Sequence, residues 1–345
     1  MKLIYDNIIY SLQRSGGISL YWSSLETYLK QDIHLLYINH EKNIFFPVSS
    51  TVQRIKNNNF ILIERYKNIS LPEESPFIFH SSYYRYCKSK NAINITTIHD
   101  FIYEYFRHDI KSIIHKIQKK NAIYNSQGII FVSESTKSDF EKFFPKYKGM
   151  KKVIYHGVLS EYKKIEIFKK NNVIFIGGRK VYKNFIYAVQ ILERLPKLKL
   201  QIIGGDLLNK KEISILNKYI PNRFEYYNSL SNNELNEKYN EAYFLLYPSS
   251  YEGFGFPVIE AQAANCPVVC CNVSSLPEVA GDAAIYISGK NIEDDLIKIN
   301  QLTDQNFYNN ILEKGLKNSK RFSWEICAEE TYNFYKEVYN LYLNQ

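Results

Sequence analysis

The chain has 345 residues, of which 45% are hydrophobic and 23% are charged. This composition is typical of globular proteins and excludes a disordered or fibrous chain, and the length suffices for two domains of ordinary size. The net charge of +9 lies in the first half, because residues 1–157 contain 22 Lys and Arg against 13 Asp and Glu, whereas residues 158–345 contain 22 of each. Nucleic-acid binding is not expected, since no zinc-finger spacing, RNP-like motif or basic repeat accompanies this charge.

Hydropathy and cysteine spacing predict a cytoplasmic protein. No apolar stretch is long enough for a transmembrane helix, and the segment Met1–Leu12 includes Asp6 and is typical of a strand rather than of a secretion signal. The five cysteines are odd in number and form no Cys-x-x-Cys pair. They indicate buried free thiols rather than disulfides or a zinc site.

Strands are predicted to alternate with helices along both halves of the chain. In the first half, the apolar runs that we expect to be strands are Leu3–Tyr10, Ile33–Ile38, Phe77–His80, Ile95–Ile98, Ile129–Ser133 and Val153–Tyr155. In the second half they are Val173–Ile176, Lys199–Ile203, Phe224–Tyr227, Ala242–Tyr247, Val268–Cys271 and Ala284–Ile287. This alternation predicts an α/β protein with two doubly wound domains. His156–Val158 and the polar residues that follow are the expected connection between a domain at residues 1–157 and a domain at residues 158–325.

Two further segments are predicted to be amphipathic helices. Glu104–Tyr124 places isoleucines on one helical face, which we expect to be core: Ile110, Ile113, Ile114 and Ile117. The polar side chains away from that face are His115, Lys116 and Lys119, and we expect them to be solvated. Near the carboxyl end, Phe322-Ser323-Trp324 precedes a second amphipathic run at Ile326–Tyr342.

The most informative motif runs from Ser249 to Ala261, where two acids flank a Gly-rich turn. The apolar run before it predicts a strand, and Pro257 is suited to the first turn of a helix, so the glycines lie at a strand-to-helix turn. Such a turn lets backbone N–H groups approach a phosphate or a sugar closely. A plain tight turn is the alternative, but it would require neither Glu252 nor Glu260. The residues expected to bind a ligand here are Gly253, Phe254, Gly255, Phe256, Pro257, Val258 and Glu260.

This motif resembles that of glycosyltransferase family 4, retaining sugar-nucleotide transferases with the signature Glu, seven residues, Glu. The resemblance continues through Pro267-Val268-Val269 and the segment Ser275–Ala284. It implies that Glu260 binds the ribose, that Glu252 contacts the donor sugar, and that the amides between them hold sugar and phosphate. It also implies the GT-B fold, in which two Rossmann-like domains face each other across a cleft. In that fold a final helix, here residues 326–345, packs back on the first domain.

Three other segments carry candidate site residues. Gly177-Gly178 ends an expected strand and is followed by Arg179 and Lys183, cations that can clamp a diphosphate; a solvated basic loop is the alternative. Gly16-Gly17 opens an expected helix, where a simple turn is the alternative. His99 follows an expected strand, where a buried structural histidine is the alternative, and Asp100 could orient its ring. The resemblance implies that Gly16, Gly17 and Gly178 contact the donor and that Arg179, Lys183 and His99 join Glu252 in catalysis.

The implied activity is transfer of a sugar from a nucleotide diphosphate to a hydroxyl with retained anomeric configuration. No Asp-x-Asp motif occurs, so protein cations rather than a metal are expected to neutralise the diphosphate, and no cofactor is expected. The short chain resembles bacterial enzymes of O-antigen or capsule synthesis, which implies a lipid-linked saccharide acceptor, and GDP-mannose is the first candidate donor. A GT-B-fold sugar-nucleotide 2-epimerase and a non-catalytic sugar-nucleotide-binding protein are the alternatives. The basic first half is expected to dock on an anionic membrane surface at the inner face of the cytoplasmic membrane.

Overall fold

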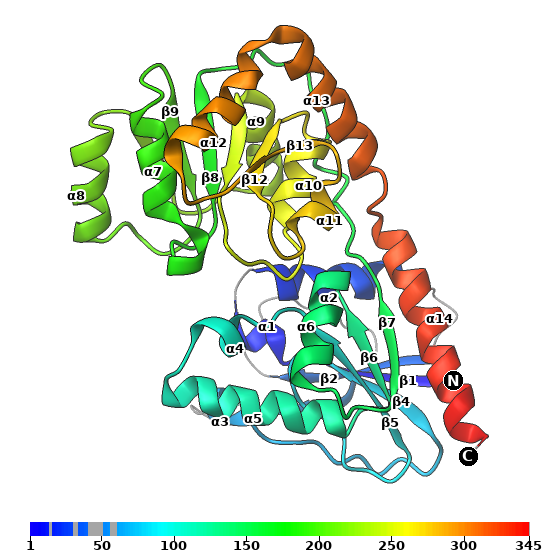
Figure 1. Ribbon diagram of the computed structural model, residues 1–345. Coiled ribbons are helices and arrows are strands. Elements are labelled where there is room, and N and C mark those ends of the chain that lie inside the picture. The colour runs from blue at the N-terminus through cyan, green and yellow to red at the C-terminus, as the bar shows by residue number, and fades with distance from the viewer. Residues whose placement is uncertain (14–15, 30–33, 41–50, 56–60, 345) are drawn as a thin grey trace. The chain divides into compact units, whose positions relative to one another are not determined.

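The computed structural model describes the whole chain except residues 14–15, 30–33, 41–50, 56–60 and 345. It divides the chain into two compact units (Figure 1). Unit 1 comprises Met1–Gly157 and Trp324–Gln345, and unit 2 comprises Val158–Ser323. No helix of the described residues has the length and apolarity that a membrane span requires.

Unit 1 contains a parallel sheet of seven strands in the order β3-β2-β1-β4-β5-β6-β7. The strands are β1 (Lys2–Asp6), β2 (His34–His40), β3 (Thr51–Ile55), β4 (Phe77–Ser81), β5 (Ala92–Ile98), β6 (Gly128–Phe131) and β7 (Met150–Val153). The helices are α1 (Ile9–Leu12), α2 (Gly17–Tyr28), α3 (Ile61–Glu64), α4 (Ile102–Phe106), α5 (Ile110–Tyr124), α6 (Glu134–Phe143) and α14 (Trp324–Leu343). Strands β4 and β5 are buried along their full length, as expected for a parallel sheet that helices cover on both faces.

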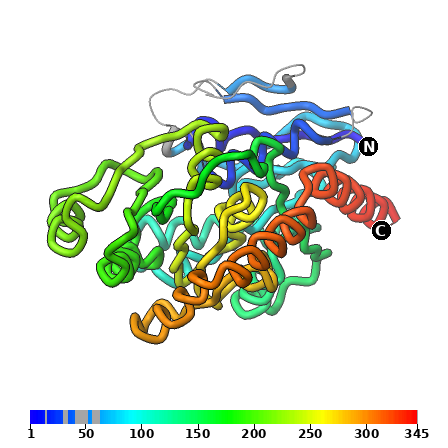
Figure 2. Tube along the Cα trace, turned by 90° about the horizontal axis from the view of Figure 1, so that it is seen from above, coloured from blue at the N-terminus to red at the C-terminus, as the bar shows by residue number. Residues whose placement is uncertain are grey.

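The C-terminal helix α14 belongs to unit 1, where it packs against α2, β4 and β5 (Figures 1 and 2). Hydrogen bonds as well as apolar side chains hold α14 against the sheet of unit 1. The Tyr335 hydroxyl lies 3.0 Å from the Tyr5 hydroxyl and 2.6 Å from His80 Nδ1, so α14 is joined to β1 and β4. Buried hydroxyls need such partners, and these bonds fix the position of the helix along the sheet.

Unit 2 contains a parallel sheet of six strands in the order β10-β9-β8-β11-β12-β13. The strands are β8 (Asn172–Ile176), β9 (Lys199–Ile203), β10 (Phe224–Tyr227), β11 (Phe244–Tyr247), β12 (Val268–Cys271) and β13 (Ala284–Ile287). The helices are α7 (Phe185–Glu193), α8 (Lys210–Tyr219), α9 (Asn232–Glu241), α10 (Phe256–Ala263), α11 (Leu276–Ala280), α12 (Ile292–Ile299) and α13 (Gln305–Ser319), with short 3₁₀ turns at Val181–Lys183 and Asn300–Thr303. This strand order is that of a doubly wound Rossmann-like sheet, so the predicted fold class is confirmed.

Several predicted boundaries are wrong. The first strand ends at Asp6, and the apolar residues after it form the short helix α1, because an apolar run alone does not distinguish a strand from a buried helix. Strand β3 was not predicted. The strand that was predicted at Val153–Tyr155 is β7, which begins at Met150 and ends at Val153. Strand β7 is an edge strand that carries Lys151 and Lys152, and it therefore lacks the apolar run of a central strand. The expected helix at 104–124 is two helices, α4 and α5.

Candidate functional site

The predicted site in unit 2 lies where the strand order of the sheet reverses. Strands β8 and β11 are neighbours, although β9 and β10 lie on the other side of β8. The loops that follow β8 and β11 therefore leave the sheet at the same edge, which is the usual ligand site of open α/β sheets. Hydrogen bonds to backbone carbonyls join these loops: the Ser250 amide and hydroxyl donate to the Tyr182 carbonyl at 2.7 and 3.1 Å, and the Asn184 side chain donates to the Pro248 carbonyl at 2.9 Å.

The Gly-rich turn leads directly into α10. Gly255 is the residue before the first helical turn and has a φ of 107°, which L side chains rarely adopt, and Pro257 lies in that first turn as predicted. The serines after β12 hold the turn in place. The Ser275 hydroxyl donates to the carbonyls of Glu252 and Phe254, and the Glu252 amide donates to the Ser274 hydroxyl at 2.9 Å. The sequence analysis assigned no role to either serine.

Gly255→Ala is expected to lower the free energy of unfolding by about 1–3 kcal/mol, because the new side chain would occupy a strained backbone conformation. Its Cβ would also lie 3.1 Å from Leu276 Cδ2. Urea denaturation measures this loss. Gly178→Ala is the matched control, since a Cβ at Gly178 meets nothing within 4 Å and the change in unfolding free energy should stay within about 0.5 kcal/mol. Equal stability of the two variants would contradict the assigned strain.

Lys183 and Glu252 form the charged centre of the site. Lys183 Nζ lies 2.5 Å from Glu252 Oε1 and 2.8 Å from the Tyr247 hydroxyl, and the Lys183 and Glu252 side chains are only 13% and 10% exposed. Burial, reinforced by the Glu252 charge, raises the pKa of Tyr247 well above its usual value, so its hydroxyl stays protonated. A cation and an acid from two different loops thus meet at the switch point. Tyr247, the third member, was not predicted.

Glu260 lies on α10 behind the turn, in the second turn of the helix. Its carboxylate is buried and accepts a hydrogen bond from the Tyr239 hydroxyl at 3.1 Å. Burial raises the pKa of Glu260 to about 7. A carboxyl group with few partners inside the protein is suited to accept hydrogen bonds from a ligand's hydroxyl groups. Tyr239 comes from α9, and no motif of the sequence indicated its contact with Glu260.

Arg179 lies apart from this cluster in the structure. Its guanidinium donates to Glu212 Oε1 at 3.0 Å, to the Gly204 carbonyl at 3.1 Å and to the Asp206 carbonyl, and its side chain is 4% exposed. These bonds direct it toward the loop between β9 and α8. Lys183 also differs from expectation, since it ends a 3₁₀ turn before α7 rather than lying inside the helix. Arg179 and Lys183 are close in the sequence, but in the structure they bond to different partners, Glu212 and Glu252.

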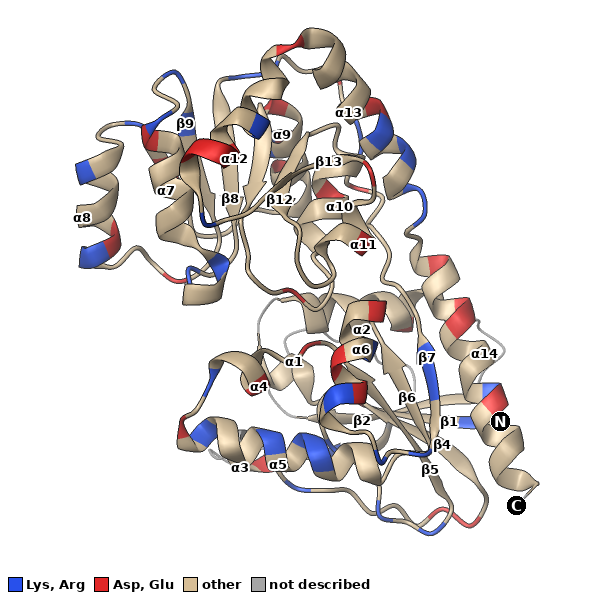
Figure 3. Cartoon of the chain, viewed as in Figure 1, with Lys and Arg blue, Asp and Glu red and all other residues tan. Residues whose placement is uncertain are grey.

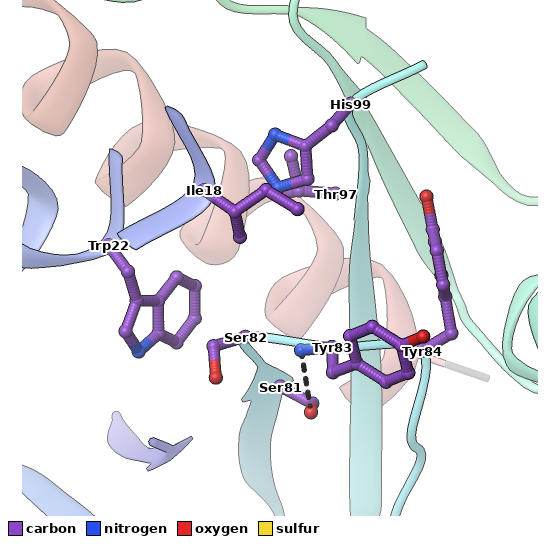
Figure 4. Close-up of a pocket in the computed structure, with 8 residues that line it drawn as sticks. All are labelled: Ile18, Trp22, Ser81, Ser82, Tyr83, Tyr84, Thr97 and His99. Carbon is purple, nitrogen blue, oxygen red and sulfur yellow. Dashed lines mark hydrogen bonds between the residues drawn. The ribbon is translucent and has the colours of Figure 1, made fainter. Parts of the chain in front are cut away.

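The predicted residues of unit 1 follow two strands that lie on either side of β4: Gly16 and Gly17 come after β1 and α1, and His99 comes directly after β5. Gly16 precedes the first turn of α2, and Gly17 begins that helix, whose first turn has no side-chain cap. A small pocket is lined by Thr97 and His99 from the end of β5, by Ile18 and Trp22 from α2, and by residues 81–84 (Figure 4).

The His99 imidazole in this pocket is neutral at physiological pH. Burial lowers the pKa of His99 to about 3, and the charge of Lys119 adds to this effect. The ring packs against the rings of Tyr21 and His156, whose centroids are 5.3 and 6.0 Å away. Asp100 does not orient it, because its carboxylate accepts from the Ile102 amide instead. A neutral imidazole in a pocket can exchange hydrogen bonds with a sugar hydroxyl.

All five cysteines are free and buried, as predicted. Burial raises the pKa of Cys266 to about 11 and that of Cys271 to about 12. These two thiols are therefore protonated and unreactive at neutral pH.

Comparison with known proteins agrees with the motifs. Residues 159–321 match the family model of glycosyl transferases group 1. An O-antigen chain mannosyltransferase B of Escherichia coli is 43% identical over 99 residues, which are 28% of this chain and 26% of that protein. An uncharacterized glycosyltransferase of Methanocaldococcus jannaschii is 28% identical over 98% of this chain and 99% of its own length.

The fold is likewise that of solved GT-B enzymes. The structure of the Anabaena protein HepE in complex with UDP-glucose matches this chain with a TM-score of 0.69 at 14% identity, covering 98% of this chain and 100% of that one. At this identity the match shows the fold alone. Residues 159–321 are thus similar to glycosyl transferases group 1, and the two sheets have the fold of solved GT-B structures.

Proposed function

We propose that the chain transfers a sugar from a nucleotide-diphosphate sugar to a hydroxyl of a saccharide acceptor, with retained anomeric configuration and without a metal. The observation that carries this proposal is the Lys183–Glu252 pair at the switch point of unit 2, beside the start of α10. A cation and a helix N-terminus together suit a diphosphate, and an acid beside them suits sugar hydroxyls. No established activity of a relative is needed for this chemical argument.

Each residue has a distinct role in the proposed reaction. Lys183 neutralises the charge that develops on the leaving diphosphate, and the amides of the Gly-rich turn bind its oxygens. Glu252 accepts hydrogen bonds from the donor sugar and positions it, and Glu260 binds the ribose hydroxyls. Arg179 would reach the diphosphate only after exchanging its bonds to Glu212 and to the two loop carbonyls. His99 in unit 1 offers a neutral ring to a sugar hydroxyl.

The reaction can proceed with retention if the leaving phosphate oxygen accepts the acceptor's proton on the face from which it departs. The bond between the anomeric carbon and the phosphate oxygen breaks as the acceptor oxygen bonds to the same face. Glu252 is held by Lys183 and by the serine loop, which suits positioning rather than nucleophilic attack. NMR of the product's anomeric configuration tests this part of the proposal, and an inverted product would reject it.

The first candidate donor is GDP-mannose, and the first candidate acceptor is a lipid-linked saccharide of bacterial O-antigen or capsule synthesis at the inner face of the cytoplasmic membrane. Support comes from the relative named as an O-antigen chain mannosyltransferase, of which this chain matches only part. The solved neighbour with UDP-glucose makes a uridine donor the second candidate. Donor-dependent increases of the melting temperature distinguish the two, since ligand binding to the native state stabilises it.

Donor incubation without an acceptor tests the alternative functions. A 2-epimerase would convert the sugar nucleotide into its epimer, whereas a transferase requires the acceptor for turnover beyond slow hydrolysis. A binding protein would raise the melting temperature with the donor and form no product with any acceptor. Chromatographic separation of epimers, followed by mass spectrometry of acceptor mixtures, separates these outcomes.

The rate of transfer is expected to be unchanged in EDTA. The proposal assigns the neutralisation of the diphosphate to Lys183 and to the backbone amides at the start of α10, so a divalent ion has no role in it. The measurement compares initial rates in EDTA with rates after magnesium or manganese is restored. A rate that depends on the ion would show that the proposed charge neutralisation is incomplete.

A further inference from the structure

Helix α5 exposes its apolar face and buries its polar one. The isoleucines that the sequence analysis placed in the core are exposed at 77%, 52%, 43% and 55%: Ile110, Ile113, Ile114 and Ile117. They recur at spacings of three and four residues and therefore form one continuous stripe along the helix. The predicted orientation of this helix is wrong.

The buried face of α5 includes three polar residues, Ser112, His115 and Lys119, and the lysine among them is paired. Lys119 Nζ lies 3.1 Å from Glu104 Oε2 on α4 and 2.6 Å from the Asp100 carbonyl, and it lies 3.9 Å from the centre of the Phe101 ring. The His115 ring stacks on Tyr103 at 3.8 Å between ring centres. These contacts make burial of the lysine tolerable, because its charge keeps an ionic partner and hydrogen bonds. Periodicity reveals an apolar face, but it does not show which face contacts the protein.

The four exposed isoleucines form a continuous surface on one side of the helix rather than a scattered set of exposed residues. Successive residues of a helix are about 100° apart, so the four isoleucines lie within about 50° of the stripe's midline, opposite the buried face. Phe106 and Tyr124 continue the apolar surface beyond the two ends, at 42% and 45% exposure. Soluble proteins seldom leave such contiguous apolar surface uncovered, and its presence indicates an interaction site.

Within α5 the charges beside the stripe are all positive, and the acid Asp109 caps the N-terminus of the helix. Segment 110–124 contains four lysines and no acidic residue. Lys119 is neutralised by Glu104, whereas Lys111 and Lys120 are exposed. At about 100° per residue, Lys111 lies on one flank of the stripe, and Lys116 and Lys120 lie on the other. Figure 3 shows Lys and Arg positions along α5. An apolar stripe with lysines on both flanks, one on one side and two on the other, is the pattern of a helix that lies in the interface of an anionic membrane, with apolar side chains in the acyl region and cations at the headgroups.

We infer that α5 docks unit 1 on an anionic phospholipid bilayer by inserting the Ile110–Ile117 stripe into the interface. Charge decides between a bilayer and a protein as the occupant. A second copy of this chain would bring the lysines of one stripe against those of the other, whereas anionic headgroups complement them on both flanks. Docking through α5 deepens the proposed function. It rests on that function in one respect, which is that the acceptor is lipid-linked. It replaces the expectation that the positive charge of the first half alone attaches the chain to the membrane, and Lys119, which was expected to be solvated, is buried and takes no part.

Sedimentation of the full chain with vesicles tests the inference. The vesicles are phosphatidylcholine alone or phosphatidylcholine with phosphatidylglycerol, and the variants are Ile113→Asp/Ile117→Asp and Lys111→Gln/Lys120→Gln. We expect the wild type to sediment with the anionic vesicles and the isoleucine variant to partition at least about tenfold less. The lysine variant should lose the preference for anionic over neutral vesicles. Ile297→Asp is the matched control, because Ile297 is 68% exposed on α12 of unit 2, and it should bind as the wild type does.

Unaltered circular dichroism and melting temperature establish that each variant is folded. Wild-type protein that stays in the supernatant, or equal sedimentation of the isoleucine variant, would overturn the inference. Loss of a dimer in analytical ultracentrifugation of that variant would overturn it in favour of a second copy as the occupant. Sugar-nucleotide binding, measured on the same samples, should be equal in all of them. Failure of the wild type to bind any sugar nucleotide would instead reject the proposed function and leave the vesicle result standing.

Discussion

Lys183→Ala is expected to lower kcat by about 10²–10³-fold, the usual cost of removing one preorganised group that stabilises charge in the transition state. The effect has two physical sources. The leaving diphosphate loses its nearest protein cation, and the nearly buried carboxylate of Glu252 loses the ammonium group 2.5 Å away. An unpaired carboxylate would then repel the donor's phosphates. We therefore expect the donor affinity to fall together with turnover.

Lys180→Ala is the matched control for this prediction. Lys180 lies three residues earlier in the same loop, and it is exposed. Single-turnover rates and donor affinity should stay near the wild-type values in this variant, because its charge is screened by water. Lys183→Arg serves as a second comparison, since it keeps the charge but not the compact ammonium group. Wild-type turnover of Lys183→Ala would remove Lys183 from the proposed mechanism.

The part of the site that could be predicted from the sequence consists of residues that are close to one another along the chain. Glu252, Gly255 and Glu260 lie within one strand-turn-helix unit, so their local spacing fixes their relative positions. The contact between Lys183 and Glu252 was harder to predict from the sequence, because it depends on β8 and β11 being neighbours in the sheet. Tyr239 and Tyr247 were not predicted, because tyrosine is abundant in this chain and neither residue belongs to a motif.

Two long side chains show why sequence alone does not give the partner of a charge. Arg179 follows β8 as a phosphate-binding arginine would, but its length lets it reach Glu212 and the carbonyls after β9. Lys119 appears in the sequence as a surface lysine, but it reaches a buried partner in Glu104. In both cases the tertiary partner, which lies more than ten residues away in the chain, decides where the charge goes. Hydrophobic periodicity carries no information about such partners.

The donor affinity is expected to fall about tenfold as the pH is lowered from 8 to 6, because Glu260 must be ionised to accept hydrogen bonds from the ribose hydroxyls. The sign follows from the raised pKa of about 7. Above pH 7 the carboxylate is ionised in the free protein and binding requires no loss of a proton. Below pH 7 the carboxyl group is protonated, and each further pH unit requires about 1.4 kcal/mol to remove the proton.

Few other groups can imitate this pH dependence. All seven histidines lie within residues 1–157, and His99 has a pKa of about 3, so no imidazole of unit 2 titrates in this range. The diphosphate of an intact sugar nucleotide has no proton to lose near pH 7. Calorimetric titration at several pH values in buffers of different ionisation enthalpy measures both the affinity and the proton released on binding. Glu260→Gln should bind more weakly at pH 8 and show no change of affinity with pH, and a persistent pH dependence in this variant would assign the titration to another group.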